Sequence, residues 1–165
     1  MSNQSNLSNE EAALYNSAYL GFLLYSAIRE YKLASGRNFS TNLAFILAPL
    51  AVNQILSTRL PKSTTTSLDK WVGENDGYLF LVPELVKGYV PSVIDAIEFL
   101  VLSGTISIDE DNCFVLMVDN LPKGPALFTK SSDMKEALRA AKHLGKWLSQ
   151  VDSDVTIYTK FGVRP

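Results

Sequence analysis

The chain has 165 residues, of which 47% are hydrophobic and 19% charged, and its net charge is −2. This composition excludes a disordered tail, a collagen-like repeat and a small disulfide-rich scaffold, and it supplies enough apolar side chains for one core. The near-neutral charge gives the whole chain no general attraction for nucleic acid or anionic membranes, although residues 1–122 carry −6 and residues 123–165 carry +4. We predict one mainly helical domain, residues 10–165, after a disordered leader, residues 1–9.

A long first helix is predicted from Asn9 to about Ala34, with a stop at Ser35-Gly36. Its stretch 18–28 is apolar almost all round, which is typical of a helix buried on several sides. This stretch and the next apolar run, 43–56, are both shorter than the ~20 continuous apolar residues of a membrane span. The N-terminus also lacks the basic start and apolar centre of a signal peptide, so we expect a cytoplasmic protein.

The second helix is predicted from Leu43 to about Arg59, with Ser40 or Thr41 as its cap. Pro49 lies inside it and predicts a kink or two short helices. The polar stretch 62–67 follows. Next, Thr66 and Asp69 have the spacing of a capping box that opens a helix through Val72.

In the middle of the chain, the sequence predicts a short helix over 79–87 and a second helix from Pro91 to Ser103, which Gly104 ends. Two strands, 105–108 and 113–118, are predicted to follow. Helices followed directly by one β-hairpin predict a winged-helix-like unit over 66–118. The only polar groups on the helix that begins at Pro91 are Ser92, Asp95 and Glu98. A helix that reads bases needs Arg, Lys, Asn or Gln on its outer face, so this helix favours protein contact over DNA.

The C-terminal part, 132–165, predicts two amphipathic helices after a loop over 119–132. The first is capped by Ser132 or Asp133 and runs to about Val151, and the second lies between Ser153 and Gly162. Its long helix carries a basic ridge, opposite its apolar side, formed by Lys135, Arg139, Lys142 and Lys146. This ridge is either a solvated face or a docking surface for an acidic partner or a phosphate backbone. Gly145 costs the helix about 1 kcal/mol relative to Ala, which close packing of another element would explain.

No catalytic constellation is present in the sequence. Motifs of phosphate-binding loops, dinucleotide sites, zinc proteases and serine hydrolases are absent. His143 is the single histidine and is interpreted as a surface or half-buried helix residue, and the single cysteine, Cys113, as a small core residue. The carboxylates at 109–111 are interpreted as a solvated turn and the pair Asp95 and Glu98 as an exposed face. We therefore expect no enzyme, no metal and no cofactor, although an unrecognised enzyme stays an alternative.

Four stretches, taken in order, resemble the middle component family of bacterial three-component ABC systems. They are Tyr15-Asn16 leading to 21–24, the stretch 60–71 (LPKSTTTSLDKW), the stretch 140–147 (AAKHLGKW), and the terminal 157–165 (IYTKFGVRP). The resemblance implies a small protein encoded between an ABC-type ATPase of the SMC or RecN sort and a variable third component. Such systems are thought to act in conflicts with phages or plasmids, and the middle component is thought to join the ATPase to an effector. No catalytic residues are implied.

These inferences leave two main functional hypotheses. The first is a non-catalytic adaptor in an obligate hetero-oligomer with an ABC/SMC-like ATPase and an effector, with DNA contacted, if at all, through the assembled complex. Its expected partner contacts are polar or terminal residues whose presence packing alone does not explain: Lys62, Ser63, Thr64, Thr66, Ser67, Val163, Arg164 and Pro165. The second is a winged-helix DNA-binding protein or regulator that uses the basic ridge.

Overall fold

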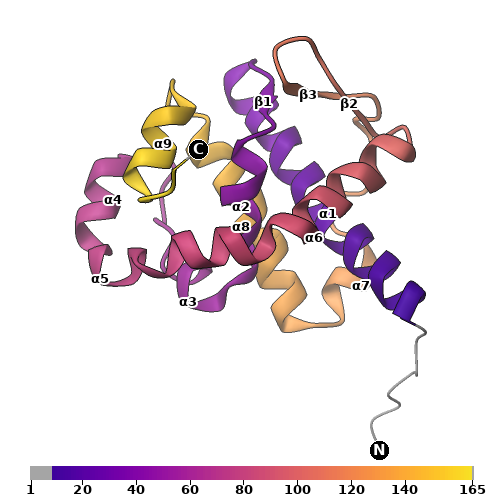
Figure 1. The fold of residues 1–165 in the computed structure, drawn as a ribbon, viewed down its shortest axis with the longest axis horizontal. Coiled ribbons are helices and arrows are strands. Elements are labelled where there is room, and N and C mark those ends of the chain that lie inside the picture. Colours follow the sequence, from indigo (N-terminus) through magenta and orange to yellow (C-terminus); the bar gives the residue numbers. More distant parts are fainter. Residues whose placement is uncertain (1–8, 165) are drawn as a thin grey trace, which may run out of the picture.

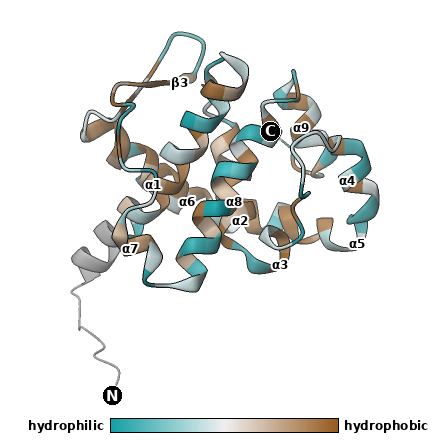
Figure 2. Ribbon diagram, turned by 180° about the vertical axis from the view of Figure 1, so that it is seen from behind, coloured by the Kyte–Doolittle hydropathy of each residue, from teal (hydrophilic) through white to brown (hydrophobic). Residues whose placement is uncertain are grey.

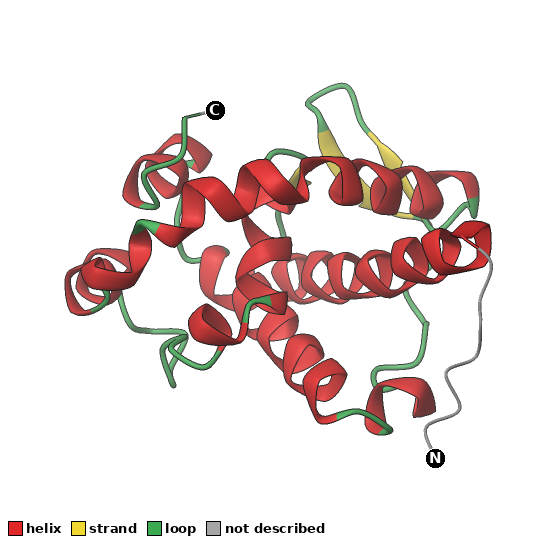
Figure 3. Cartoon of the chain, turned by 60° about the horizontal axis from the view of Figure 1, so that its bottom comes forward, coloured by secondary structure: helices red, strands yellow, loops and turns green. Residues whose placement is uncertain are grey.

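The computed structural model describes residues 9–164, with side chains described from residue 16 (Figure 1). Most of the predicted leader, residues 1–8, and the predicted contact residue Pro165 lie outside the described residues. The described chain is mainly helical and carries one small antiparallel sheet, as expected from the sequence (Figure 3). Within it, no helix is long and apolar enough to cross a membrane.

Helix α1, Asn9–Ser35, is the central element of the fold. Its predicted end is confirmed, because Gly36 adopts a φ of +71° that stops the helix. From Leu20 to Arg29 every side chain except that of Phe22 is buried. Three helices pack around this stretch, namely α2 (Leu43–Val52), α6 (Leu81–Leu102) and α8 (Ser132–Leu148). The apolar run therefore forms the core of a globular domain.

The second predicted helix is divided into α2, Leu43–Val52, and α3, Gln54–Ser57. The chain breaks at Asn53 rather than at Pro49, which stays inside α2. Asn53 has extended backbone angles and its side chain accepts a hydrogen bond from the amide of Leu56, so it caps α3. The predicted caps Ser40 and Thr41 were wrong: α2 begins after Asn42, whose side chain makes no capping bond.

The next helices are α4, Leu68–Glu74, α5, Asp76–Leu79, and α6, Leu81–Leu102. Ser67, not Thr66, caps α4, because its side chain accepts from the amide of Lys70. The prediction that a helix starts at Pro91 was wrong, because Pro91 lies in the middle of the single helix α6. Pro91 and the preceding turn, Lys87 and Gly88, are exposed, so the carbonyl that loses its helical partner can bond to water. The predicted stop is confirmed at Gly104, with a φ of +71°.

The sheet contains β1, Phe39–Ser40, β2, Ile106–Ile108, and β3, Cys113–Leu116, in the order β1-β3-β2. The predicted hairpin β2–β3 is confirmed, but the sequence did not predict β1. Phe39 pairs with Phe114 and both rings are buried, 6.2 Å apart. Cys113 points away from this core and is half-buried, so its prediction as a core residue was wrong.

The C-terminal part contains α7, Ala126–Thr129, α8, Ser132–Leu148, and α9, Asp154–Lys160. The predicted loop 119–132 thus includes one short helix. Ser131 rather than Ser132 or Asp133 caps α8, whereas the predicted cap of α9, Ser153, is confirmed. The apolar side of α8 is buried against α1 and α2, and its polar residues form bands along the ribbon in Figure 2.

The glycine in α8 marks a very close approach of two helices in the core. A Cβ built on Gly145 would lie 2.3 Å from the carbonyl oxygen of Ala27 in α1. Only glycine allows the two backbones this distance, so the predicted packing reason for Gly145 is confirmed. The closely packed pair α1–α8 therefore forms a rigid core that supports the elements at both ends of the molecule.

Candidate partner interface

Three of the sequence stretches singled out above meet at one end of the molecule, where α4, α9 and the end of α8 lie together (Figure 1). Their aromatic residues form a buried cluster: Trp71 of α4 lies 5.3 Å from Trp147 of α8 and 5.7 Å from Phe161, ring centre to ring centre. All three are about 1% exposed. The cluster holds together segments that are up to 90 residues apart in the chain.

Both indole groups bind the backbone of the segment that precedes α4. The Nε1–H of Trp71 donates to the carbonyl of Arg59 over 2.7 Å, and the Nε1–H of Trp147 donates to the carbonyl of Thr66 over 2.7 Å. A buried indole N–H needs such an acceptor. The segment between them, residues 60–66, is therefore fixed at both ends although it has no helix or strand.

A groove of about 570 Å³ opens beside this cluster. One wall of the groove is formed by the 64–69 segment. The other wall runs from the end of α8 to the first turn of α9 and includes Gln150, Asp152 and Thr156. Of the predicted contact residues, Thr64, Thr66 and Ser67 line it. The lining combines hydroxyl groups, an apolar floor at Trp147 and the two carboxylates Asp69 and Asp152, so the groove offers hydrogen-bonding and acidic chemistry.

The predicted residues Lys62 and Ser63 lie next to the groove and outside its lining. Both are exposed. The Ser63 hydroxyl lies 2.7 Å from that of Thr65 and also accepts from the Thr65 amide, which shapes the turn. The Lys62 ammonium group makes no ion pair within the described residues, so its charge stays available at the rim.

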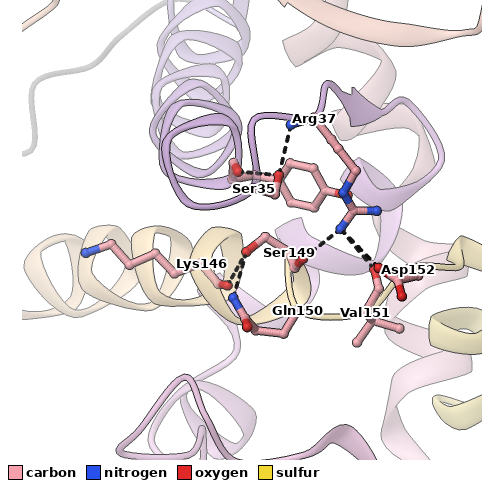
Figure 4. Close-up of polar contacts among 8 residues, drawn as sticks. Ser35, Arg37, Lys146, Ser149, Gln150, Val151 and Asp152 are labelled. Atoms are coloured by element: carbon pink, nitrogen blue, oxygen red, sulfur yellow. Dashed lines mark hydrogen bonds and ion pairs between the residues drawn. The ribbon is translucent and has the colours of Figure 1, made fainter.

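The second wall is held by Arg37, which sequence reasoning did not identify (Figure 4). Its Nη2 donates to the carbonyl of Ser149 over 2.7 Å and to that of Val151 over 3.4 Å, and it lies 3.9 Å from a carboxylate oxygen of Asp152. The Ser149 hydroxyl in turn donates to the carbonyl of Lys146. These bonds satisfy carbonyl groups at the end of α8 that the helix itself cannot. No local signal links Arg37 to a segment 112 residues away.

The C-terminal segment lies on the other side of the cluster. Val163 is half-buried, and its amide donates to the carbonyl of Tyr158 over 3.0 Å in the helix-ending turn at Gly162. Arg164 is exposed. The hydroxyl of Tyr158 donates to the carbonyl of Asn42, and burial, aided by the charge of Asp154, raises the pKa of Tyr158 to about 12. An ion pair between Lys160 and Asp69 joins α9 to α4.

The basic ridge of α8 is present but largely paired. Arg139 forms a two-pronged ion pair with Glu136, at 2.9 and 2.6 Å, which lowers the pKa of Glu136. Lys146 lies 3.5 Å from Glu30 of α1, and the Lys142 ammonium group donates to the carbonyl of Lys123. Only for Lys135 is there no such contact among the described residues. The ridge thus presents less free charge than its sequence indicates.

The remaining candidate residues lie where the sequence predicted them. Asp95 and Glu98 are on the exposed face of α6. His143 is half-buried, and burial together with the charges of Arg139 and Lys146 lowers its pKa despite a hydrogen bond to the backbone of Pro61. Asp109 accepts from the amides of Asp111 and Cys113, as expected for a turn. In the described part of the chain no three His, Cys, Asp or Glu side chains are grouped to hold a metal ion.

Comparison with protein families shows to which family the chain belongs. The family model of the ABC-three component (ABC-3C) system Middle Component 3 matches residues 4–165. The chain belongs to this family. No match was found among curated proteins or among solved structures. The protein is therefore a middle component of an ABC-3C system. Three of the four stretches that carried the resemblance, 60–71, 140–147 and 157–165, meet at the tryptophan cluster, and the fourth lies in α1.

Proposed function

We propose that this middle component is a non-catalytic adaptor that joins an ABC/SMC-like ATPase to an effector in a bacterial defence system against phages or plasmids. The observation that supports it best is the convergence of the 64–69 segment, the end of α8 and α9 on one groove. The tryptophans and Phe161 are explained by packing, whereas the exposed Lys62, Ser63 and Arg164 around them are not. Exposed polar residues beside a rigid recess are typical of a protein-binding surface.

The groove is the proposed contact for one partner. It is rigid, because Arg37 and the two indole bonds fix both walls, so a partner would bind at small cost in ordering. A chain whose composition is rich in apolar residues and low in charge also suits a subunit of a permanent complex. We propose obligate assembly with the other two components of the system, in the cytoplasm.

The test is co-purification from the native operon with an N-terminal tag. We expect the ATPase at a fixed ratio with the wild-type chain, and a reduction of at least tenfold with the double variant Lys62→Glu and Arg164→Glu. The matched control reverses two exposed lysines elsewhere, Lys87→Glu and Lys130→Glu, and should retain the partner. Equal melting temperatures would show that all variants fold. A wild-type chain that purifies alone, or equal loss in both double variants, would refute the proposal.

The DNA-binding alternative is less well supported. The element order runs from α1 and β1 through five helices, α2 to α6, to β2 and β3, with β3 central in the sheet, and in a winged-helix interpretation α6 would be the reading helix. The exposed face of α6, however, carries Ile94, Asp95, Glu98 and Leu102, and carboxylates repel phosphates. We propose that this unit contacts protein. Salt-sensitive duplex binding that disappears when Lys135, Arg139, Lys142 and Lys146 are all changed to Glu would instead support the alternative.

A further inference from the structure

A second recess lies between the C-terminal half of α1, the sheet and the loop 119–123, and it shares no lining residue with the groove. Its volume is about 690 Å³, within the range of about 300–1,000 Å³ of ligand sites. Its lining combines apolar side chains, among them Ile28, Leu33, Val115 and Leu116, with the cations Arg29, Lys32 and Lys123 and the carboxylate Asp119.

Arg29 is the unusual member of this lining. It is only 5% exposed, and its Nε and Nη2 atoms have no hydrogen-bond partner, while Nη1 donates to the carbonyl of Leu121 over 2.8 Å. Its guanidinium group also lies 5.0 Å from the ring centre of Tyr25. No carboxylate lies within ion-pair distance of it in the part of the chain described. A buried cation that lacks a counter-ion is strongly unfavourable unless something supplies one.

The charges nearby increase this imbalance. Lys142 points to the loop from α8 and donates to the carbonyl of Lys123. Burial and the charges of Arg29, Lys123 and Lys146 lower the pKa of Lys142, and Glu30 offsets this only in part. The lining thus carries three cations, Arg29, Lys32 and Lys123, against the single carboxylate Asp119, so the recess has a net positive charge that favours an anion.

The sheet edge at the recess adds a backbone contribution. β1 pairs with β3 only at Phe114 and Cys113, which leaves Val115 and Leu116 without a neighbouring strand on that side. Directly before β3 the carbonyl of Asn112 accepts from the amide of Thr41 on the β1 side, and directly after β3 the amide of Met117 donates to the carbonyl of Thr105 on the β2 side. By the alternation of an antiparallel strand, the amide and carbonyl of Leu116 face the open edge. An extended peptide could pair there.

From these observations we infer that the recess binds an extended acidic–apolar peptide segment of a partner protein, whose carboxylate pairs with Arg29. The Nε and Nη2 donors of Arg29 have almost no solvent-accessible surface, so the carboxylate pairs with them by two parallel bonds after the guanidinium group turns toward the recess. The apolar lining accepts the neighbouring side chains, and the open edge at Leu116 sets the direction of the segment. Like the adaptor proposal, this inference supposes a protein partner, but it concerns a separate site and is tested on the chain alone.

The test uses the isotope-labelled full chain and NMR titration. The probe is the capped peptide acetyl-Thr-Leu-Glu-Val-Thr-amide, and its control replaces Glu by Gln. We expect the Glu peptide to shift the methyl signals of Ile28 and Val115 and the amide of Leu116, and to bind about tenfold more tightly than the Gln peptide, a factor that corresponds to about 1.4 kcal/mol. Equal binding of both peptides, or shifts elsewhere only, would overturn the inference.

Variants at the exposed rim residue Leu33, 71% exposed, leave the buried Arg29 intact. Leu33→Glu should abolish the preference for the Glu peptide, because its own carboxylate competes, and Leu33→Gln of the same size should retain it. A third titration uses hexanoate. If hexanoate saturates the same signals more tightly than the Glu peptide, the site takes a free small acid and the peptide assignment is refuted; weaker binding of hexanoate supports it.

Discussion

The contact between α1 and α8 allows a sharp test, because one substitution should have opposite effects at two helical glycines. A Cβ at Gly145 would lie 2.3 Å from the Ala27 oxygen and 3.0 Å from two further backbone atoms of Ala27, where ordinary contacts are 3.4–4 Å. Gly145→Ala therefore requires the helices to separate by about 1 Å, a gap that removes a quarter to a half of each dispersion contact along the seam.

The expected magnitude follows from two opposing terms. Overpacking against backbone costs about 1–3 kcal/mol or more, since backbone cannot rotate away as a side chain can. The better helix propensity of Ala returns up to about 1 kcal/mol. We expect Gly145→Ala to lower the free energy of unfolding by about 1–3 kcal/mol and the melting temperature by about 2–10 °C. The control Gly88→Ala, inside α6 with nothing within 4 Å of its Cβ, should raise the stability by about 0.5–1 kcal/mol.

The assay is urea unfolding followed by circular dichroism, with the midpoints compared at equal slopes. Unequal slopes would mean that the variant changed the unfolded or native ensemble, and the comparison would then use melting temperatures. A Gly145→Ala protein as stable as wild type, or a change of the same sign at Gly145 and Gly88, would refute the close-packing argument.

Two further predictions concern the tryptophan end of the molecule. Trp147→Phe removes the donor to the Thr66 carbonyl, so it should cost about 1–3 kcal/mol in urea unfolding and increase hydrogen exchange in the segment 62–67; unchanged exchange there would contradict the role of the indole bond. Because the pKa of Tyr158 is about 12 in the folded chain against 10 ordinarily, the folded state binds more protons between these values, and stability should fall as pH rises from about 10 to 12. Tyr158→Phe should lack this part of the decline, and ultraviolet absorbance titration should show one late-ionising tyrosine fewer in this variant, with Tyr31, whose pKa burial also raises, remaining.

The elements that the sequence predicted well are those set by local signals. Gly36, Gly104 and Gly162 each adopt a φ near +70° at the end of a helix, and Ser153 caps α9 through its own side chain. The hairpin was predicted from the alternation around the acidic turn. Each of these depends on residues a few positions apart, where steric and hydrogen-bonding preferences suffice.

The elements that the sequence did not predict depend on distant partners or on exposure. β1 has two residues and exists because Phe39 and Ser40 pair with Phe114 and Cys113, more than 70 residues later. Pro91 was interpreted as a helix start, yet α6 continues through it on the solvent side, where the lost hydrogen bond costs least. Arg37 donates a hydrogen bond to the carbonyl of Ser149, and no local sequence pattern predicts this long-range contact.

The same limit applies to the candidate sites. Resemblance to a family identified the stretch 62–67, whereas only the structure shows that Thr64, Thr66 and Ser67 line a groove, because its other wall is formed by residues more than 80 positions later. The basic ridge was predicted correctly from the spacing of residues on one helix. Its free charge is reduced because Lys146 pairs with Glu30 of α1 and Arg139 pairs with Glu136. Arg29 was hidden in an apolar run, where sequence gives no sign that its donors lack partners.

The two recesses are connected through the α1–α8 pair. Arg37, just after α1, holds the groove wall at the end of α8, and Arg29, two turns earlier in α1, lies in the second recess. Helices α1 and α8 approach each other closely at Gly145. This tightly packed contact fixes the positions of both recesses relative to one another. The groove is lined by hydroxyls and the carboxylates Asp69 and Asp152, whereas the second recess carries three cations against the single carboxylate Asp119, so they select different ligands. The adaptor that we propose needs two contact surfaces of different specificity held at a constant distance, and the two recesses would supply them.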